Sequence, residues 1–324
     1  QDSSPVILFV GQVPRKFRRR EAFQEIDFEA MFAPIAKWAV EVDDAARVPE
    51  ITARAFAVAA GGRPGPVVVS LPEDMLTDEV DVLDAQVIAN AAPEPSDNDI
   101  ARLRELLAAA ERPLTIFGGG GWSSEICMEF EAFCKSNGLP AVSSFRTMDI
   151  LNNDHPNFVG ELGYNTNPQL AERVRNADLL LVIGARLGET TSQAYTIIKA
   201  PRPDQTMVHV YPDHSELGRV FQSDLPIVSG IGEFLAKARR HIQLDPDRWA
   251  AWLESGRDDF EAWTVPVDVP GPLNPARLFV ELRDILSDEA IITTDAGNFA
   301  GWTSRFFRFR TYRTQLGPAN GSMG

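Results

Sequence analysis

The stretch that decides the fold reads Ala290-Ile-Ile-Thr-Thr-Asp-Ala-Gly-Asn-Phe-Ala-Gly-Trp302, and a second glycine turn, Asn320-Gly-Ser-Met-Gly324, follows it. The first part predicts a buried strand, a tight glycine turn and the start of a helix. A strand that feeds a helix through such a turn brings unpaired backbone N–H groups to one point, which suits a phosphate or a pyrophosphate. We therefore expect an anion-binding α/β unit at this end of the sequence.

Upstream of this stretch, apolar strands alternate with helices in two further segments. Residues 1–90 contain expected strands at Val6–Val10 and Val67–Leu71 and a helix near Pro49–Ala60. In residues 97–244, we expect strands at Pro113–Phe117, Ala141–Ser143, Asp178–Ile183 and Met207–Val210. Unbroken apolar strands of this kind are typical of parallel sheets covered on both faces. We predict an α/β fold with three parallel-sheet units, at 1–90, 97–244 and 273–324, and a linker at 245–272.

Composition narrows the class of protein. A chain of 324 residues with 44% hydrophobic and 24% charged residues can bury several cores. The net charge of -15 argues against binding nucleic acid or an anionic membrane surface. The two cysteines, Cys127 and Cys134, lie about 10 Å apart along an expected helix, too far for a disulfide, so we expect reduced core residues. No signal peptide or long apolar stretch occurs, and we expect a cytoplasmic protein.

Several motifs allow two interpretations. The turn Gly118–Gly121 follows a strand and could cradle a dinucleotide, but it lacks the G-x-G-x-x-G spacing, and we favour a close turn without a ligand. The four histidines show no metal spacing, and His209 lies in an apolar strand, which favours a core role. Ser322 has no candidate triad around it. The basic run Arg15–Arg20 could bind phosphates, although a solvated loop is the simpler interpretation.

Five short motifs point to a family. They are Gly11-Gln-Val-Pro-Arg15, Glu21-Ala-Phe-Gln-Glu25, Ile35-Ala-Lys-Trp38, Gly62-Arg-Pro-Gly-Pro-Val67 and Leu71-Pro-Glu-Asp74. In their order and spacing they resemble acetolactate synthase and its thiamine-diphosphate-dependent relatives. The resemblance implies the C-terminal part of a pyrimidine-binding domain at 1–90, a middle Rossmann-like domain at 97–244, and the start of a diphosphate-binding domain at 273–324. It covers essentially the whole chain.

The resemblance also implies a chemistry and a set of site residues. It implies decarboxylation of a 2-oxo acid and joining of the product to a second carbonyl, with thiamine diphosphate and Mg²⁺ as cofactors. Phe23, Gln24 and Lys37 match positions on the substrate side, although Lys37 could instead be an exposed lysine at a helix end. Met323 matches the apolar support of the bent cofactor. The matching cofactor-binding positions are Ala296, Gly297, Asn298, Phe299, Gly321, Ser322 and Met323.

Two features of the family fall outside this sequence. The resemblance places the activating glutamate upstream of Gln1 and the magnesium ligands downstream of Gly324, so we expect no metal ligands within the chain and a longer polypeptide around it. It also implies a homodimer or homotetramer whose active site lies between subunits, where Phe23 of one chain meets Met323 of another.

One departure from the family pattern concerns flavin. Flavin-containing acetolactate synthases carry Arg-Phe-Asp-Asp-Arg where this chain has Arg186-Leu-Gly-Glu-Thr190, so FAD is not expected. The alternatives to carboligation are a decarboxylase or lyase of the same family, which forms no new C–C bond. An alternative from another class is a nucleotide-binding or scaffolding module without catalysis.

Overall fold

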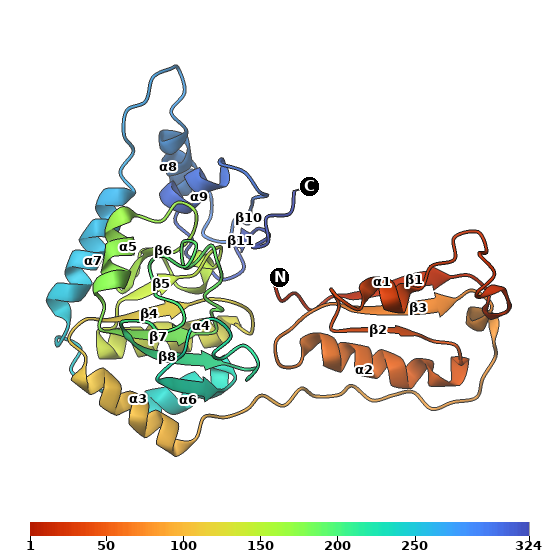
Figure 1. Ribbon diagram of the computed structural model, residues 1–324. Helices are drawn as coiled ribbons and strands as arrows, with labels where there is room; N and C mark the ends of the chain where they lie inside the picture. Colours follow the sequence, from red (N-terminus) through yellow and green to blue (C-terminus); the bar gives the residue numbers. More distant parts are fainter. Residues whose placement is uncertain (324) are drawn as a thin grey trace. The chain divides into compact units, whose positions relative to one another are not determined.

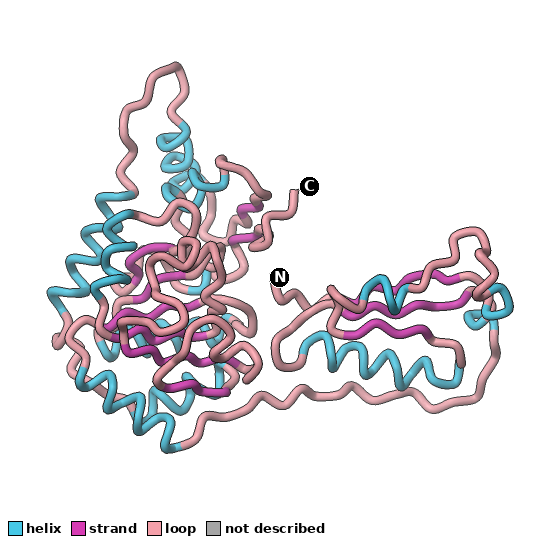
Figure 2. The backbone as a smooth tube through the Cα atoms, viewed as in Figure 1, coloured by secondary structure: helices cyan, strands magenta, loops and turns pink. Residues whose placement is uncertain are grey.

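The computed structural model describes residues 1–323, and the chain divides into two compact units, Gln1–Ala92 and the part from Pro93 onward. The described chain contains three sheets, and every strand pair in them is parallel. The predicted α/β fold with parallel sheets is thus confirmed. Residues 78–96, which lead from the first unit to the second, contain neither helix nor strand (Figure 2).

The first unit is a three-stranded sheet with one long helix. Strands β1 (Ile7–Gln12), β3 (Val67–Pro72) and β2 (Trp38–Glu41) lie in that order. Helix α2 (Val48–Ala60) buries one face against β3 through the i, i+4, i+8 positions Ile51, Ala55 and Ala59. The shorter elements are α1 (Phe28–Phe32), η1 (Arg15–Phe17), η2 (Ala45–Arg47) and η3 (Met75–Thr77).

The second unit is built on a six-stranded sheet (Figure 1). Its order is β6 (Phe158–Glu161), β5 (Ala141–Ser143), β4 (Pro113–Phe117), β7 (Leu179–Ile183), β8 (Thr206–Tyr211) and β9 (Leu225–Val228). In chain order this is 3-2-1-4-5-6, the doubly wound arrangement, whose order reverses between β4 and β7. The carboxyl ends of the strands therefore meet at one edge of the sheet.

Helices cover both faces of this sheet because successive strand residues point to opposite sides. Phe117 of β4 belongs to the core beneath one face, whereas Leu114 and Ile116 belong to the core beneath the other. The covering helices are α3 (Asp97–Ala109), α4 (Ser124–Asn137), α5 (Pro168–Asn176) and α6 (Ile231–His241), and η4 (Met148–Ile150) follows β5. Side-chain caps from Ser96 and Ser123 begin α3 and α4, as their positions before apolar-periodic runs predict.

The stretch 245–272, predicted as a linker, contains helix α7 (Ala250–Trp263). The indole N–H groups of Trp249 and Trp252 donate to the carbonyls of Ala110 and Pro113, and Trp249 is buried. These tryptophans bring the stretch into the core of the second unit, because a large indole whose N–H finds an acceptor gains much by burial.

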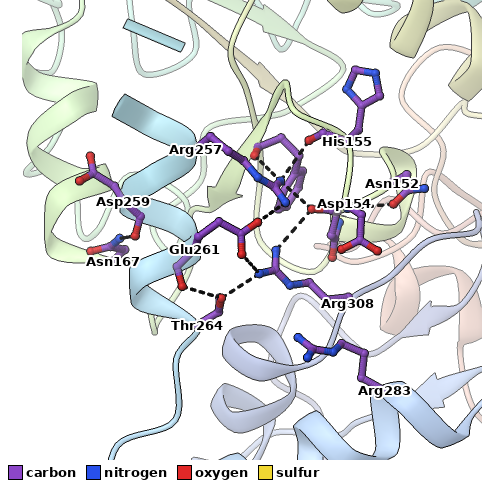
Figure 3. A network of polar contacts seen from close by, with 12 residues as sticks. Asn152, Asp154, His155, Asn167, Arg257, Asp259, Glu261, Thr264, Arg283 and Arg308 are labelled. Atoms are coloured by element: carbon purple, nitrogen blue, oxygen red, sulfur yellow. Dashed lines mark hydrogen bonds and ion pairs between the residues drawn. The ribbon is translucent and has the colours of Figure 1, made fainter. Parts of the chain in front are cut away.

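A polar network ties α7 to the chain that follows it (Figure 3). Arg257 on α7 donates to the carbonyls of Asn153, His155 and Phe158, and its guanidinium also pairs with Glu261. Glu261 in turn accepts from Arg308 at 2.6 Å. The middle segment, α7 and the terminal segment are therefore held together within one unit.

The terminal segment contains α8 (Pro275–Ile285), β10 (Ile292–Thr293), α9 (Ala300–Phe306) and β11 (Gln315–Leu316). The expected order of strand, glycine turn and helix is present. The prediction of a buried strand was wrong, because β10 has two residues, of which Ile292 is half-buried and Thr293 is exposed. In the described chain β10 pairs with β11 in a two-stranded sheet.

Among the described residues, no helix is long and apolar enough to cross a membrane. Both cysteines are free and buried, as expected. Burial raises the pKa of Cys127 to about 12 and that of Cys134 further still, so both thiols are protonated and unreactive at neutral pH.

Candidate functional site

The two predicted glycine turns lie beside each other. β10 and β11 pair in parallel, with Ile292 opposite Gln315 and Thr293 opposite Leu316. The turn at 294–299 follows β10 and the turn at 317–321 follows β11, so both leave the same edge of the sheet. In open α/β sheets, ligands bind at the carboxyl ends of such strands.

These turns form one wall of a cavity of about 400 Å³. The opposite wall comes from the loops that follow β5 and β6 in the middle segment. The lining residues are Phe145, Arg146, Glu161, Tyr164, Asn165, Ala296, Gly297, Asn298, Ala300, Gly301, Ser304, Pro318 and Gly321. The cavity is large enough for a small cofactor, and it joins aromatic walls to a few converging polar groups.

The cavity brings together four of the seven predicted cofactor-binding residues, namely Ala296, Gly297, Asn298 and Gly321. The other three lie beside it along the chain. Phe299 is the N-cap residue of α9, and its side chain is exposed. Ser322 donates its N–H and its hydroxyl to the Asn320 side chain, and the Met323 side chain is 78% exposed.

The turn after β10 presents free backbone donors. Gly297 has a φ of 146°, and a Cβ there would lie 2.9 Å from the Phe299 ring, so only glycine fits. In the part of the chain that the structure describes, the N–H groups of Gly297 and Asn298 donate to no protein acceptor. At Gly321 a Cβ would meet nothing within 4 Å, which leaves open space above the second turn. These features fit an anionic group such as a diphosphate.

Glu161, at the end of β6, supplies the titratable group of the cavity. Burial raises the pKa of its carboxyl to about 7, although the N–H of Arg146 and the hydroxyl of Ser304 partly counteract this. The Arg146 N–H lies 2.7 Å from Glu161 Oε1. Near neutral pH this carboxyl is therefore partly protonated.

Glu161→Gln tests the raised pKa through stability. The folded state holds the Glu161 proton between pH 4.5 and about 7, whereas the unfolded state releases it, so the unfolding free energy falls as pH rises through this window. Glutamine does not ionise, so the stability of Glu161→Gln lacks this dependence on pH. The stability of Glu161→Gln relative to the unsubstituted protein should rise by about 2 kcal/mol between pH 5 and pH 8, measured by urea unfolding at several pH values. The exposed Glu254→Gln is the control. A pH-independent difference for Glu161→Gln would contradict the assignment.

The predicted substrate residues lie in the first unit and fall into two places. Phe23 is 88% exposed and Gln24 has a φ of 68°, in a loop shaped by Glu25, whose carboxylate accepts the N–H groups of Arg19 and Ala22. The side chain of Gln12, at the carboxyl end of β1, donates to the Ile26 carbonyl and holds this loop at that edge of the sheet.

Lys37 lies elsewhere in this unit, immediately before β2 and hence at the amino edge of the same parallel sheet. Its ammonium donates to the carbonyls of Val58 and Gly61 at the C-terminal end of α2, at 2.5 and 2.7 Å. A cation at a helix C-terminus is stabilising, and this contact explains the position of Lys37 structurally. The structure does not bring Lys37 together with Phe23 and Gln24.

The alternative motifs take structural roles. A Cβ on Gly119 would lie 2.1 Å from the Gly184 carbonyl oxygen, so the glycine turn allows two backbones to meet where the strand order reverses. His209 is buried, its Nε2 lies 2.9 Å from the Ala185 carbonyl, and burial lowers its pKa. This is the core role we expected.

Two of the five basic side chains in the run Arg15–Arg20 pair with carboxylates. Arg15 contacts Asp74 and Asp78, and Arg18 contacts Glu41. Over the described residues, no group of three or more His, Cys, Asp or Glu side chains could hold a metal ion.

The wall of the cavity that comes from the middle segment was not predicted from the sequence. It includes Arg146, Glu161, Tyr164 and Asn165. Their positions in the sequence could have indicated them, because Arg146 follows β5 and Glu161 ends β6. Polar residues at the carboxyl ends of parallel strands are candidates for binding. No spacing rule links these positions to the terminal turns, which lie more than a hundred residues further along.

Comparison with known proteins agrees with this geometry. Residues 100–238 match the family model "thiamine pyrophosphate enzyme, central domain", so the doubly wound unit of this chain is a domain of that class. Over its whole length the chain is 30% identical to the probable acetolactate synthase large subunit of Methanocaldococcus jannaschii and 29% identical to the acetolactate synthase isozyme 1 large subunit of Escherichia coli. Over 95% of its length it is 31% identical to the large subunit of Parasynechococcus marenigrum.

The chain covers 56%, 57% and 51% of these three proteins, and thus spans about half the length of the curated relatives it matches. The resemblance to thiamine-diphosphate-dependent enzymes of the acetolactate synthase type is therefore confirmed. The whole chain is thus similar to part of these enzymes, and its residues 100–238 match their central domain.

Proposed function

We propose that this chain forms part of an enzyme that uses thiamine diphosphate to decarboxylate a 2-oxo acid and joins the product to a second carbonyl. The observation that carries the proposal is the meeting of the two glycine turns at one cavity, in a chain that aligns throughout with acetolactate synthase large subunits. Thiamine diphosphate, when bound, supplies the electron sink that decarboxylation requires.

In this proposal each predicted cofactor-binding residue has a definite task, and Phe23, Gln24 and Lys37 face the substrate. The N–H groups of Gly297 and Asn298 receive the diphosphate, with Ala296 and Phe299 completing the turn. Gly321 and Ser322 let the second turn approach the cofactor, and Met323 supports its bent form. Mg²⁺ would bind together with the diphosphate and offset its negative charge. FAD is not part of the proposal, because Arg186–Thr190 lacks the flavin-type pattern.

The proposal includes an assembly and a location. Phe9, Met31 and Ile35 of the first unit are 49%, 56% and 67% exposed, and such apolar surface supports burial against a second copy. We propose a homodimer or homotetramer in the cytoplasm, with Phe23 of one chain facing Met323 of another across the active site.

Product analysis tests the reaction type. The full-length protein is supplied with thiamine diphosphate, Mg²⁺ and a short-chain 2-oxo acid, and released carbon dioxide and organic products are quantified. The proposal predicts a product with a new C–C bond. Carbon dioxide with an aldehyde alone would favour the decarboxylase or lyase alternative, and no turnover together with tight nucleotide binding would favour the non-catalytic module.

In the full-length protein, Met323→Ala should lower kcat about tenfold while leaving the Kd for thiamine diphosphate within about twofold. The reason is that a side chain supporting the cofactor's reactive form acts on orientation more than on affinity. Steady-state kinetics and calorimetry measure the two quantities, with Met128→Ala on exposed surface of α4 as the control. Unchanged turnover at saturating cofactor would remove Met323 from the site.

Lys37→Ala should raise the KM for the 2-oxo acid about fivefold, because a lost cation weakens carboxylate binding, and should leave cofactor affinity unchanged. It should also cost about 1 kcal/mol of stability through the lost contacts at the end of α2. Kinetics and urea unfolding separate the two effects, and Lys199→Ala is the surface control. A change in stability alone would leave Lys37 with only its structural role.

A further inference from the structure

One guanidinium joins the two glycine turns. Arg146, in the loop after β5, donates from Nη2 to the Asp295 carbonyl at 2.8 Å and from Nη1 to the Pro318 carbonyl at 2.6 Å. Asp295 lies in the turn after β10 and Pro318 in the turn after β11. Because the guanidinium is planar and its donor directions are fixed, these two hydrogen bonds set the distance between the turns.

Arg146 is itself held firmly. Its φ of 60° lies in the left-handed region, which an arginine adopts at a cost of about 1 kcal/mol. The carboxylate of Glu161 accepts its N–H, and its guanidinium lies 5.0 Å from the centre of the Phe145 ring. Phe145 packs edge-on against Tyr164. These contacts keep Arg146 in one conformation despite its strained backbone.

The space around the guanidinium is fitted to it. A Cβ on Gly317 would lie 2.9 Å from Arg146 Nη1 and 2.8 Å from the Thr294 carbonyl oxygen. Glycine at this position therefore lets the two turns and the arginine pack in contact. An alanine there would have to displace either the guanidinium or the turn.

The same loop also holds the beginning of β11. Asp149 accepts the N–H groups of Thr314 and Gln315 at 3.1 and 3.2 Å, and the Gln315 side chain accepts the N–H of Met148. The loop after β5 thus contacts the first residue of β11 and, through Arg146, the turn that follows β11. The middle segment thereby determines the geometry of the terminal turns.

We propose that Arg146 is a positioning residue that fixes the spacing of the two turns and so preorganises the thiamine diphosphate pocket. This inference rests on the proposed function, since the turns are its cofactor-binding elements. Without the arginine the turns would separate more freely. Part of the binding free energy of the cofactor would then be used to order the turns. Arg146 acts through the turns rather than on the reacting atoms.

The test compares Arg146→Met with Arg146→Lys in the intact protein. Hydrogen exchange without cofactor should be faster in Arg146→Met at Thr294 and Gly321, the residues of segments 294–298 and 317–321 whose N–H groups donate to backbone carbonyls. Calorimetry should show a Kd for thiamine diphosphate with Mg²⁺ weaker by about tenfold. Arg146→Lys keeps the charge and one donor direction, so it should recover part of the affinity. Arg202→Met, which removes a hydrogen-bonded arginine on exposed surface, should change neither quantity.

Gly317→Ala provides a second route if Arg146→Met folds poorly, because it disturbs the arginine's place and leaves the arginine in the sequence. It should reproduce the faster exchange in both segments and the weaker binding. Unchanged exchange and unchanged affinity in Arg146→Met, or in Gly317→Ala, would overturn the inference. If the unsubstituted protein fails to bind thiamine diphosphate, the proposed function itself fails, and that outcome is visible before any variant is made.

Discussion

Gly119→Ala should lower the free energy of unfolding of the second unit by about 3 kcal/mol. Gly119 has a φ of 71°, which disfavours any side chain, and its Cβ would lie 2.1 Å from the Gly184 carbonyl oxygen. That oxygen belongs to backbone at the point where the strand order reverses, so it cannot rotate away as a side chain could. Urea unfolding followed by tryptophan fluorescence measures the loss.

The neighbouring glycine provides the matched control for this prediction. A Cβ on Gly120 would meet no atom within 4 Å, and its φ lies outside the left-handed region, so Gly120→Ala should change stability by no more than about 0.5 kcal/mol. Equal effects of the two substitutions would show that close backbone approach does not explain the glycine turn. A nucleotide-binding role for the turn would then regain support.

Asn153→Ala should cost about 3 kcal/mol of stability, because it leaves several buried backbone groups without partners. The fully buried Asn153 amide donates to the carbonyls of Met148 and Leu151, and its oxygen accepts the N–H of Phe309. These contacts join the middle segment to the terminal segment. Loss of the amide should therefore also accelerate hydrogen exchange around Phe309.

The adjacent residue again supplies a matched comparison. Asn152 accepts one N–H, from Asp154 in an exposed turn, and Asn152→Ala should cost no more than about 1 kcal/mol. Chemical denaturation of both variants under the same conditions decides the matter. A loss for Asn153→Ala as small as that for Asn152→Ala would mean that the two segments are joined mainly by other contacts.

Much of the fold could be predicted from local sequence. The strands Pro113–Phe117 and Ala141–Ser143 and the helix near Pro49–Ala60 were predicted at or within one residue of their observed bounds, because apolar runs and glycine turns report directly on local structure. Helix α7 was missed, since the proline- and aspartate-rich residues around it obscure the periodicity of Ala250–Trp263.

Only part of the candidate site could be predicted from the sequence, because only some of its residues lie in local motifs. The glycine turns at 296–298 and 321 carry a local signal, whereas the contacts of Arg146 with Asp295 and Pro318 join residues 149 and 172 positions apart. No local pattern encodes such a pairing. The two-residue strand β10 likewise takes its partner from the tertiary structure rather than from its own alternation.

Calorimetric titration of the full-length protein with thiamine diphosphate and Mg²⁺, with FAD and ADP titrated separately, tests cofactor binding most directly. We expect saturable binding of thiamine diphosphate that weakens when Gly297 is replaced by valine, because a side chain there closes the turn that receives the diphosphate. We expect no stoichiometric FAD binding. Binding of FAD or ADP without any binding of thiamine diphosphate would contradict these expectations.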